Sequence, residues 1–98
     1  MNSRSKLIEQ LENKLMENYP KEIADNLLTN YSKLIELIEP DFRISLKYST
    51  NLKLIIKHKS FAQSFECYFK KGNLFLNNKK INPNNINEIL YQLLDKII

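Results

Sequence analysis

The sequence predicts one α+β domain in which two helices come first, an antiparallel sheet follows and a third helix ends the chain. Apolar residues recur at helical spacing before residue 39, alternate with polar residues from 42 to 76, and return to helical spacing after 82. A chain of 98 residues has the length of a single domain. We therefore expect a helical pair at 1–39, a four-stranded antiparallel β-meander at 42–81 and a C-terminal helix at 82–98. All helices should pack on one face of the sheet.

Proline marks the limits of the two N-terminal helices. Leucines spaced by three and four residues predict an amphipathic helix over residues 3–18. Pro20 disfavours the helical conformation in the residue before it and can occupy the first position of a second helix. The second apolar stripe continues to Ile38, and we expect the segment Glu39-Pro40-Asp41 to end the helix.

Four segments with a period of two predict the strands. Apolar and polar residues alternate over 42–48, 52–57, 61–69 and 74–76. The segments that separate them predict a three-residue loop at 49–51 and two-residue hairpin turns at Lys59-Ser60 and Gly72-Asn73.

These loops fix an expected register. The first places Leu46 opposite Leu54, the second places Leu54 opposite Phe65, and the third places Phe69 opposite Leu76. A slip of one residue would move every side chain of a strand to the other face, so we expect each strand to keep its apolar side toward the helices.

The C-terminal helix has clear start signals. Asn82 is a favourable N-cap and Pro83 a favourable first helical residue. Residues Ile86, Leu90 and Leu94 then recur at helical spacing, so this helix should also bury one face.

Basic residues are concentrated in the predicted sheet. Residues 42–81 carry nine basic side chains and one acidic side chain, whereas residues 1–41 carry five basic and eight acidic. The register also sets Lys47 opposite Lys53 and Arg43 opposite Lys57, and like charges directly opposite destabilise a sheet. We expect the face away from the helices to form a partner-binding site. Its predicted residues are Arg43, Lys47, Lys53, Ile55, Lys57, Tyr68, Lys70, Phe75 and Lys79. Glu66 is expected on the same face but not as a binding residue.

The composition of this face leaves two classes of partner open. Aromatic side chains among lysines can anchor a protein interface or stack nucleic-acid bases. The chain has thirteen lysines but only two arginines, and arginine is the preferred residue for phosphate and base recognition. We therefore favour an acidic protein surface over RNA or DNA. The same lysines are also typical of strands protected against aggregation.

The acidic helical segment and the basic sheet segment are complementary in charge. Head-to-tail association of two copies is therefore a further alternative, in which the acidic partner of one chain is a second copy of it.

The sequence carries no motif that predicts catalysis. His58 is the only histidine and Cys67 the only cysteine, and the register separates them along adjacent strands. We find no cysteine–histidine cluster for zinc, no glycine-rich phosphate loop and no serine-centred elbow. We expect a non-enzymatic subunit, chaperone, inhibitor or antitoxin-like protein, without a cofactor or a metal ion.

Two features bear on location. No apolar run approaches the roughly 20 residues of a membrane span, so we expect no membrane association. A single cysteine excludes an internal disulfide and is typical of a reducing compartment. A cytoplasmic location is the expectation.

The order of elements resembles that of the small Alu-domain subunits of the signal recognition particle. The resemblance rests on the strand Arg43-Ile44-Ser45-Leu46-Lys47-Tyr48, the following Asn51-Leu52 and the C-terminal helix. That family folds as helix, three strands and helix, and it binds RNA on a basic sheet, which the resemblance implies as the alternative function. This chain departs from it by an additional first helix, a fourth strand and a first hairpin without glycine.

Overall fold

The computed structural model describes residues 3–38 and 42–97, with the side chains of residues 6–38 and 42–96. The fold is α+β, with two N-terminal helices, an antiparallel sheet of five strands and a C-terminal helix. The elements are α1 (Ser3–Asn18), α2 (Lys21–Ile38), β1 (Phe42–Tyr48), β2 (Leu52–His58), β3 (Ser64–Lys70), β4 (Asn73–Leu76), β5 (Lys79–Ile81), the 3₁₀ turn η1 (Pro83–Asn85) and α3 (Ile86–Ile97). The helix end expected at residues 39–41 lies outside the described residues.

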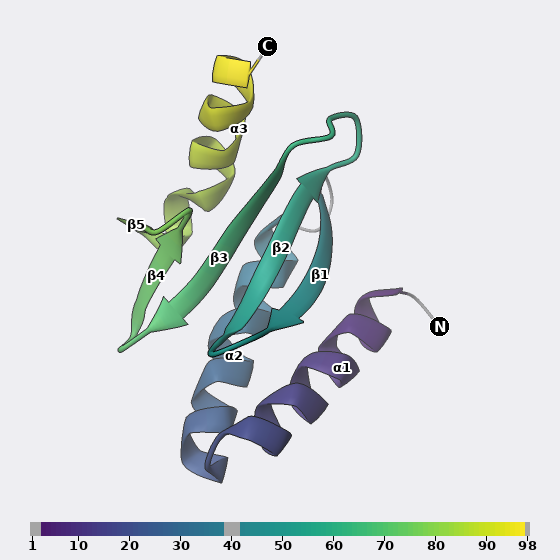
Figure 1. Cartoon of the computed structure of the whole chain (residues 1–98), viewed down its shortest axis with the longest axis vertical. Helices are drawn as coiled ribbons and strands as arrows, with labels where there is room; N and C mark the ends of the chain where they lie inside the picture. Colours follow the sequence, from purple (N-terminus) through teal and green to yellow (C-terminus); the bar gives the residue numbers. More distant parts are fainter. Residues whose placement is uncertain (1–2, 39–41, 98) are drawn as a thin grey trace.

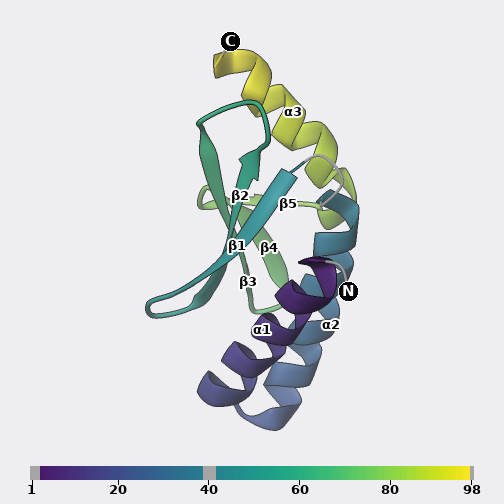
Figure 2. The ribbon, with the colours of Figure 1, turned by 90° about the vertical axis from the view of Figure 1, so that its right-hand side faces the viewer.

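The sheet is a meander in the order β1-β2-β3-β4-β5, so every strand pairs with its neighbours in sequence. Figure 1 shows the strands side by side with α2 behind them. In the perpendicular view of Figure 2, the three described helices lie on one side of the sheet, and no described helix lies on the other. The predicted packing on one face is therefore confirmed.

The fifth strand corrects the prediction of four. Asn77 and Asn78 have φ angles of 51° and 69°, and both lie in the left-handed region. Two such residues form the type I′ turn that matches the twist of a hairpin, and asparagine tolerates this conformation better than most residues. The turn sends residues 79–81 back along β4 as β5.

The register of the first hairpin is as predicted, with Leu46 opposite Leu54. The predicted registers of the second and third hairpins are wrong by two residues. Leu54 pairs with Cys67 and not with Phe65. Phe69 pairs with Leu74 and not with Leu76. A shift of two preserves which face each side chain occupies.

The loops account for both shifts. Five residues, 59–63, separate β2 from β3, where two were expected, so β3 starts at Ser64 and not at Phe61. The β3–β4 turn is centred on Lys71 and Gly72, whose φ angles are 52° and 80°, one residue earlier than expected. Glycine adopts this conformation without steric cost.

The core lies between the sheet and the helices. The buried apolar residues come from every helix and from β1 to β4. Asn82 caps the last element as expected, since its side chain accepts a hydrogen bond from the N–H of Asn84 at 3.0 Å, and α3 follows after one 3₁₀ turn.

Two tyrosines connect the helices to the backbone of the sheet. The Tyr31 hydroxyl donates to the carbonyl of Leu52 at 3.1 Å and accepts from the N–H of Phe69 at 2.9 Å. The Tyr19 hydroxyl accepts from the N–H of Leu52 at 3.2 Å. Tyr31 is fully buried, and this burial raises the pKa of its hydroxyl well above the usual value.

The α3 helix should contribute substantially to stability. Leu90 is completely buried in the core. Leu90→Ala should lower the free energy of unfolding by about 2–5 kcal/mol, because it leaves a cavity. Chemical denaturation monitored by circular dichroism measures the loss. Gln92, which is exposed on the same helix, is the matched control, and Gln92→Ala should cost clearly less. Equal losses for the two variants would contradict the packing described above.

Candidate functional site

The candidate site is the side of the sheet that no described helix covers, here called the open face (Figure 2). Alternation along each strand and the observed pairings assign its residues. Lys79 is a correction, because it pairs with Leu76 and so shares the helix-facing side, while Lys80 pairs with Phe75. The open face carries Arg43, Ser45, Lys47, Lys53, Ile55, Lys57, Ser64, Glu66, Tyr68, Lys70, Asn73, Phe75 and Lys80.

One row of side chains crosses all five strands on this face. Lys47 pairs with Lys53, Tyr68 with Phe75, and Phe75 with Lys80. The β2–β3 pairing of Leu54 with Cys67 aligns Lys53 with Tyr68, one residue further along each strand. We call Lys47, Lys53, Tyr68, Phe75 and Lys80 the central row.

An aromatic pair lies in the middle of the central row. The rings of Tyr68 and Phe75 are stacked, with centroids 5.3 Å apart and an interplanar angle of 12°. They are direct cross-strand neighbours, and not the diagonal neighbours that the predicted turn implied. The ammonium group of Lys53 lies 5.5 Å from the centroid of the Tyr68 ring, within the range of a cation–π interaction. Because Lys53 and Phe75 come from the strands on either side of Tyr68, both faces of this ring are occupied.

Glu66 is the acidic residue of the open face. Its carboxylate lies 3.4 Å from the ammonium group of Lys47 and 3.8 Å from that of Lys53. The backbone of Glu66 is held by Asn77, whose side-chain oxygen accepts from its N–H at 3.1 Å and whose N–H donates to its carbonyl at 2.8 Å. Glu66 therefore relieves the repulsion between Lys47 and Lys53, which the register sets directly opposite each other.

The open face remains strongly basic despite this carboxylate. Arg43 and Lys57 are exposed and directly opposite each other, while Lys70 and Lys80 are exposed on the other half of the sheet. Six basic side chains thus share the face with Glu66. A charge distribution of this kind attracts an acidic partner and speeds its association.

Cys67 and His58, the residue types often used as nucleophile and base, lie on the helix-facing side of the sheet. Cys67 is buried in the core, and burial raises the pKa of its thiol to about 12. Since the thiolate is the nucleophile, this cysteine is in an unreactive setting. His58 accepts a hydrogen bond from the N–H of Ser60 at Nδ1, 3.0 Å away, and packs against Phe42 and Phe61. These contacts pack the His58 ring at the end of β2.

The described residues offer no cluster of three histidine, cysteine or acidic side chains that could hold a metal ion. Within the same residues, no helix combines the length and apolar character needed to cross a membrane.

Comparison of the chain with protein-family models, with curated proteins and with solved structures found no match. The resemblance to the Alu-domain subunits therefore remains one of element order, and the functional argument depends on the site itself.

Sequence reasoning identified most of the open face but missed Lys80. The relevant signal was Asn77-Asn78 directly after the strand 74–76, since two residues that tolerate the left-handed conformation favour a two-residue hairpin turn. The double ion pair of Glu66 depends on side-chain conformations that a sequence pattern does not specify.

Glu66 should stabilise the fold through its two lysines. Glu66→Gln should lower the free energy of unfolding by about 0.5–1 kcal/mol at low salt, because exposed ion pairs contribute up to about 1 kcal/mol. Thermal unfolding at about 0.01 M and 1 M salt measures the effect, which should vanish at the higher salt concentration. Glu12→Gln, on the exposed side of α1, is the control. A loss that is independent of salt would show that Glu66 acts through packing instead.

Proposed function

We propose that this chain is a non-enzymatic binding protein that docks its open face onto an acidic surface of a partner protein. The observation that carries the proposal is the central row, in which a stacked aromatic pair is flanked by lysines on both sides. Protein interfaces concentrate binding energy in aromatic residues near their centre and keep charged residues at the rim. The open face has this arrangement.

The aromatic geometry favours a protein over a nucleic acid. A base binds by stacking on the free face of an aromatic ring. In Tyr68 one ring face is covered by Phe75 and the other by Lys53. Both rings are half-buried, and the part that remains exposed suits contact with the side chains of a protein partner.

Arginine content supports the same choice. Arg43 is the single arginine on the open face, and it lies on the outermost strand. Sequence-specific and phosphate-specific sites typically depend on bidentate arginine contacts. RNA or DNA binding through the same face is the alternative, supported by the excess of positive charge.

A binding role also fits the remaining features of the chain. The thiol of Cys67 is buried and its pKa is raised, and the ring of His58 is packed at the end of β2, so neither residue offers an activated nucleophile or base. The single cysteine suits the cytoplasmic location that we propose.

Charge reversal on the open face tests the proposal. Lys57→Glu combined with Lys80→Glu should weaken binding of the partner at least about tenfold, mainly through slower association. Both lysines are exposed, and the first substitution places a glutamate opposite Arg43, so the fold should be preserved. The control is Lys6→Glu combined with Lys21→Glu, which makes the same change of charge on the helices.

The experiment is affinity capture from an extract of the source cells, with and without nuclease, followed by binding kinetics with the captured partner. The proposal predicts a stoichiometric protein that resists nuclease, binds the helix variant and is lost with the open-face variant. Capture of nucleic acid that nuclease abolishes would instead establish the alternative. A protein that binds both variants equally would refute the role of the open face. Light scattering of the purified chain decides whether the acidic partner is a second copy.

A further inference from the structure

The first strand, β1, is an open edge of the sheet. It pairs with β2 on one side only, and no described strand lies on its other side. The opposite edge, β5, is only three residues long, and very short edge strands resist further pairing. The β1 edge is seven residues long and contains no proline, so it can accept another strand.

Hydrogen bonding shows which backbone groups of β1 face outward. The N–H and carbonyl of Leu52 bond to the hydroxyls of Tyr19 and Tyr31, so they point away from β1. Ser49 and Asn51 form the pair next to Tyr48 and Leu52, and the N–H of Ser49 donates to the carbonyl of Asn51 at 3.4 Å, so this pair is hydrogen-bonded. In an antiparallel ladder such pairs alternate. The N–H and carbonyl groups of Ile44, Leu46 and Tyr48 are therefore the ones directed to the free edge.

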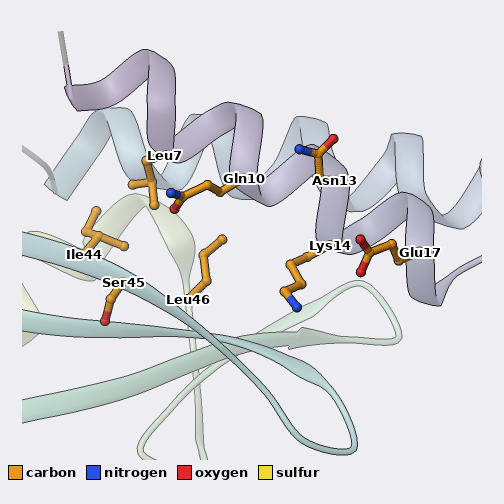
Figure 3. Close-up of a pocket in the computed structure, with 8 residues that line it drawn as sticks. All are labelled: Leu7, Gln10, Asn13, Lys14, Glu17, Ile44, Ser45 and Leu46. Carbon is orange, nitrogen blue, oxygen red and sulfur yellow. The ribbon is translucent and has the colours of Figure 1, made fainter.

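A groove runs beside this edge, between β1 and α1. Figure 3 shows Leu7 of α1 above Ile44 and Leu46 of β1, with polar side chains of the helix along the rest of the groove. Its volume is about 430 Å³. The three apolar side chains are half-buried, which leaves part of their surface for another apolar group. The groove is lined by Leu7, Gln10, Asn13, Lys14, Glu17, Ile44, Ser45 and Leu46.

The two sides of the β1 edge favour different side chains in an added strand. On the helix-facing side, an added strand would place its residues against Ile44 and Leu46, beneath α1. On the open face, it would place the alternate residues beside Arg43 and Lys47. A second copy of β1 fits poorly, because it would add its own Arg43 and Lys47 to the same basic face. A segment that alternates apolar and acidic residues satisfies both sides.

We propose that β1 binds an extended segment of a partner protein as an antiparallel sixth strand. The segment has apolar residues in the groove and acidic residues on the open face. Recognition by strand addition draws its affinity from main-chain hydrogen bonds and its specificity from alternate side chains. The proposal rests on the proposed function only for the acidic character of the partner, since the backbone contacts are separate from the central row.

The probe is a blocked peptide of about seven residues, the length of β1, that alternates valine and glutamate. Amide hydrogen exchange of the whole chain is followed by NMR with and without saturating peptide. The amides of Ile44, Leu46 and Tyr48 should exchange about tenfold or more slowly in the complex, whereas those of Ser45 and Lys47, already bonded to β2, should change little.

Two further peptides serve as matched controls. Methylation of the valine nitrogens removes the donors that face β1 and should abolish protection, while methylation of the glutamate nitrogens should leave it in place. A valine–lysine peptide should bind far more weakly because of Arg43 and Lys47.

Other outcomes would overturn the proposal. Binding of the valine–glutamate peptide without protection of the three amides would mean that it contacts only the charged surface. Protection that appears with protein concentration alone would mean that a second copy occupies the edge. The Lys57→Glu, Lys80→Glu variant separates the two proposals. It should no longer bind the acidic surface of the partner, but the peptide should still protect the amides of Ile44, Leu46 and Tyr48.

Discussion

The hydroxyl of Tyr31 joins β2 and β3 at the point where their own ladder stops. The observed pairing of these strands runs from Lys57 with Ser64 to Leu54 with Cys67. Beyond it, the carbonyl of Leu52 and the N–H of Phe69 are both bonded to Tyr31. Buried backbone groups require such partners, because an unsatisfied one costs about 1–3 kcal/mol. A side chain of the helix layer thus completes the sheet.

This bridge also determines the arrangement of the open face. Leu52 and Phe69 point toward the helices, so Lys53 and Tyr68, their direct neighbours in the chain, point to the other side. Because Tyr31 aligns Leu52 with Phe69, the ammonium group of Lys53 lies over the Tyr68 ring. The carbonyl of Leu52 that Tyr31 binds points away from β1, as the alternation of backbone groups in an antiparallel pair requires. The arrangement of the central row thus depends on one buried contact.

The sequence predicted the face of each residue better than its exact neighbour. Period-two alternation survived errors of two residues in the registers of Phe65 and Phe69, so Tyr68 and Phe75 were placed correctly on the open face. Lys79 was misplaced because the Asn77-Asn78 turn was not anticipated. This turn pairs Phe75 with Lys80 and Leu76 with Lys79, so Lys80 lies on the open face and Lys79 on the helix-facing side. Tyr31 was recognised as part of an apolar stripe, but the pattern cannot show which backbone groups a buried hydroxyl reaches.

The stability of Tyr31→Phe tests the central claim most directly. The substitution keeps the ring and removes one hydroxyl, so it should lower the free energy of unfolding by about 1–3 kcal/mol and speed amide exchange at Phe69. Tyr68→Phe is the control, since its hydroxyl makes an exposed bond to Asn78, 3.3 Å long, and its loss should cost under about 0.5 kcal/mol. If Tyr31→Phe unfolds like the control and Phe69 keeps its protection, the tyrosine does not hold the two strands together, and the account of the open face fails with it.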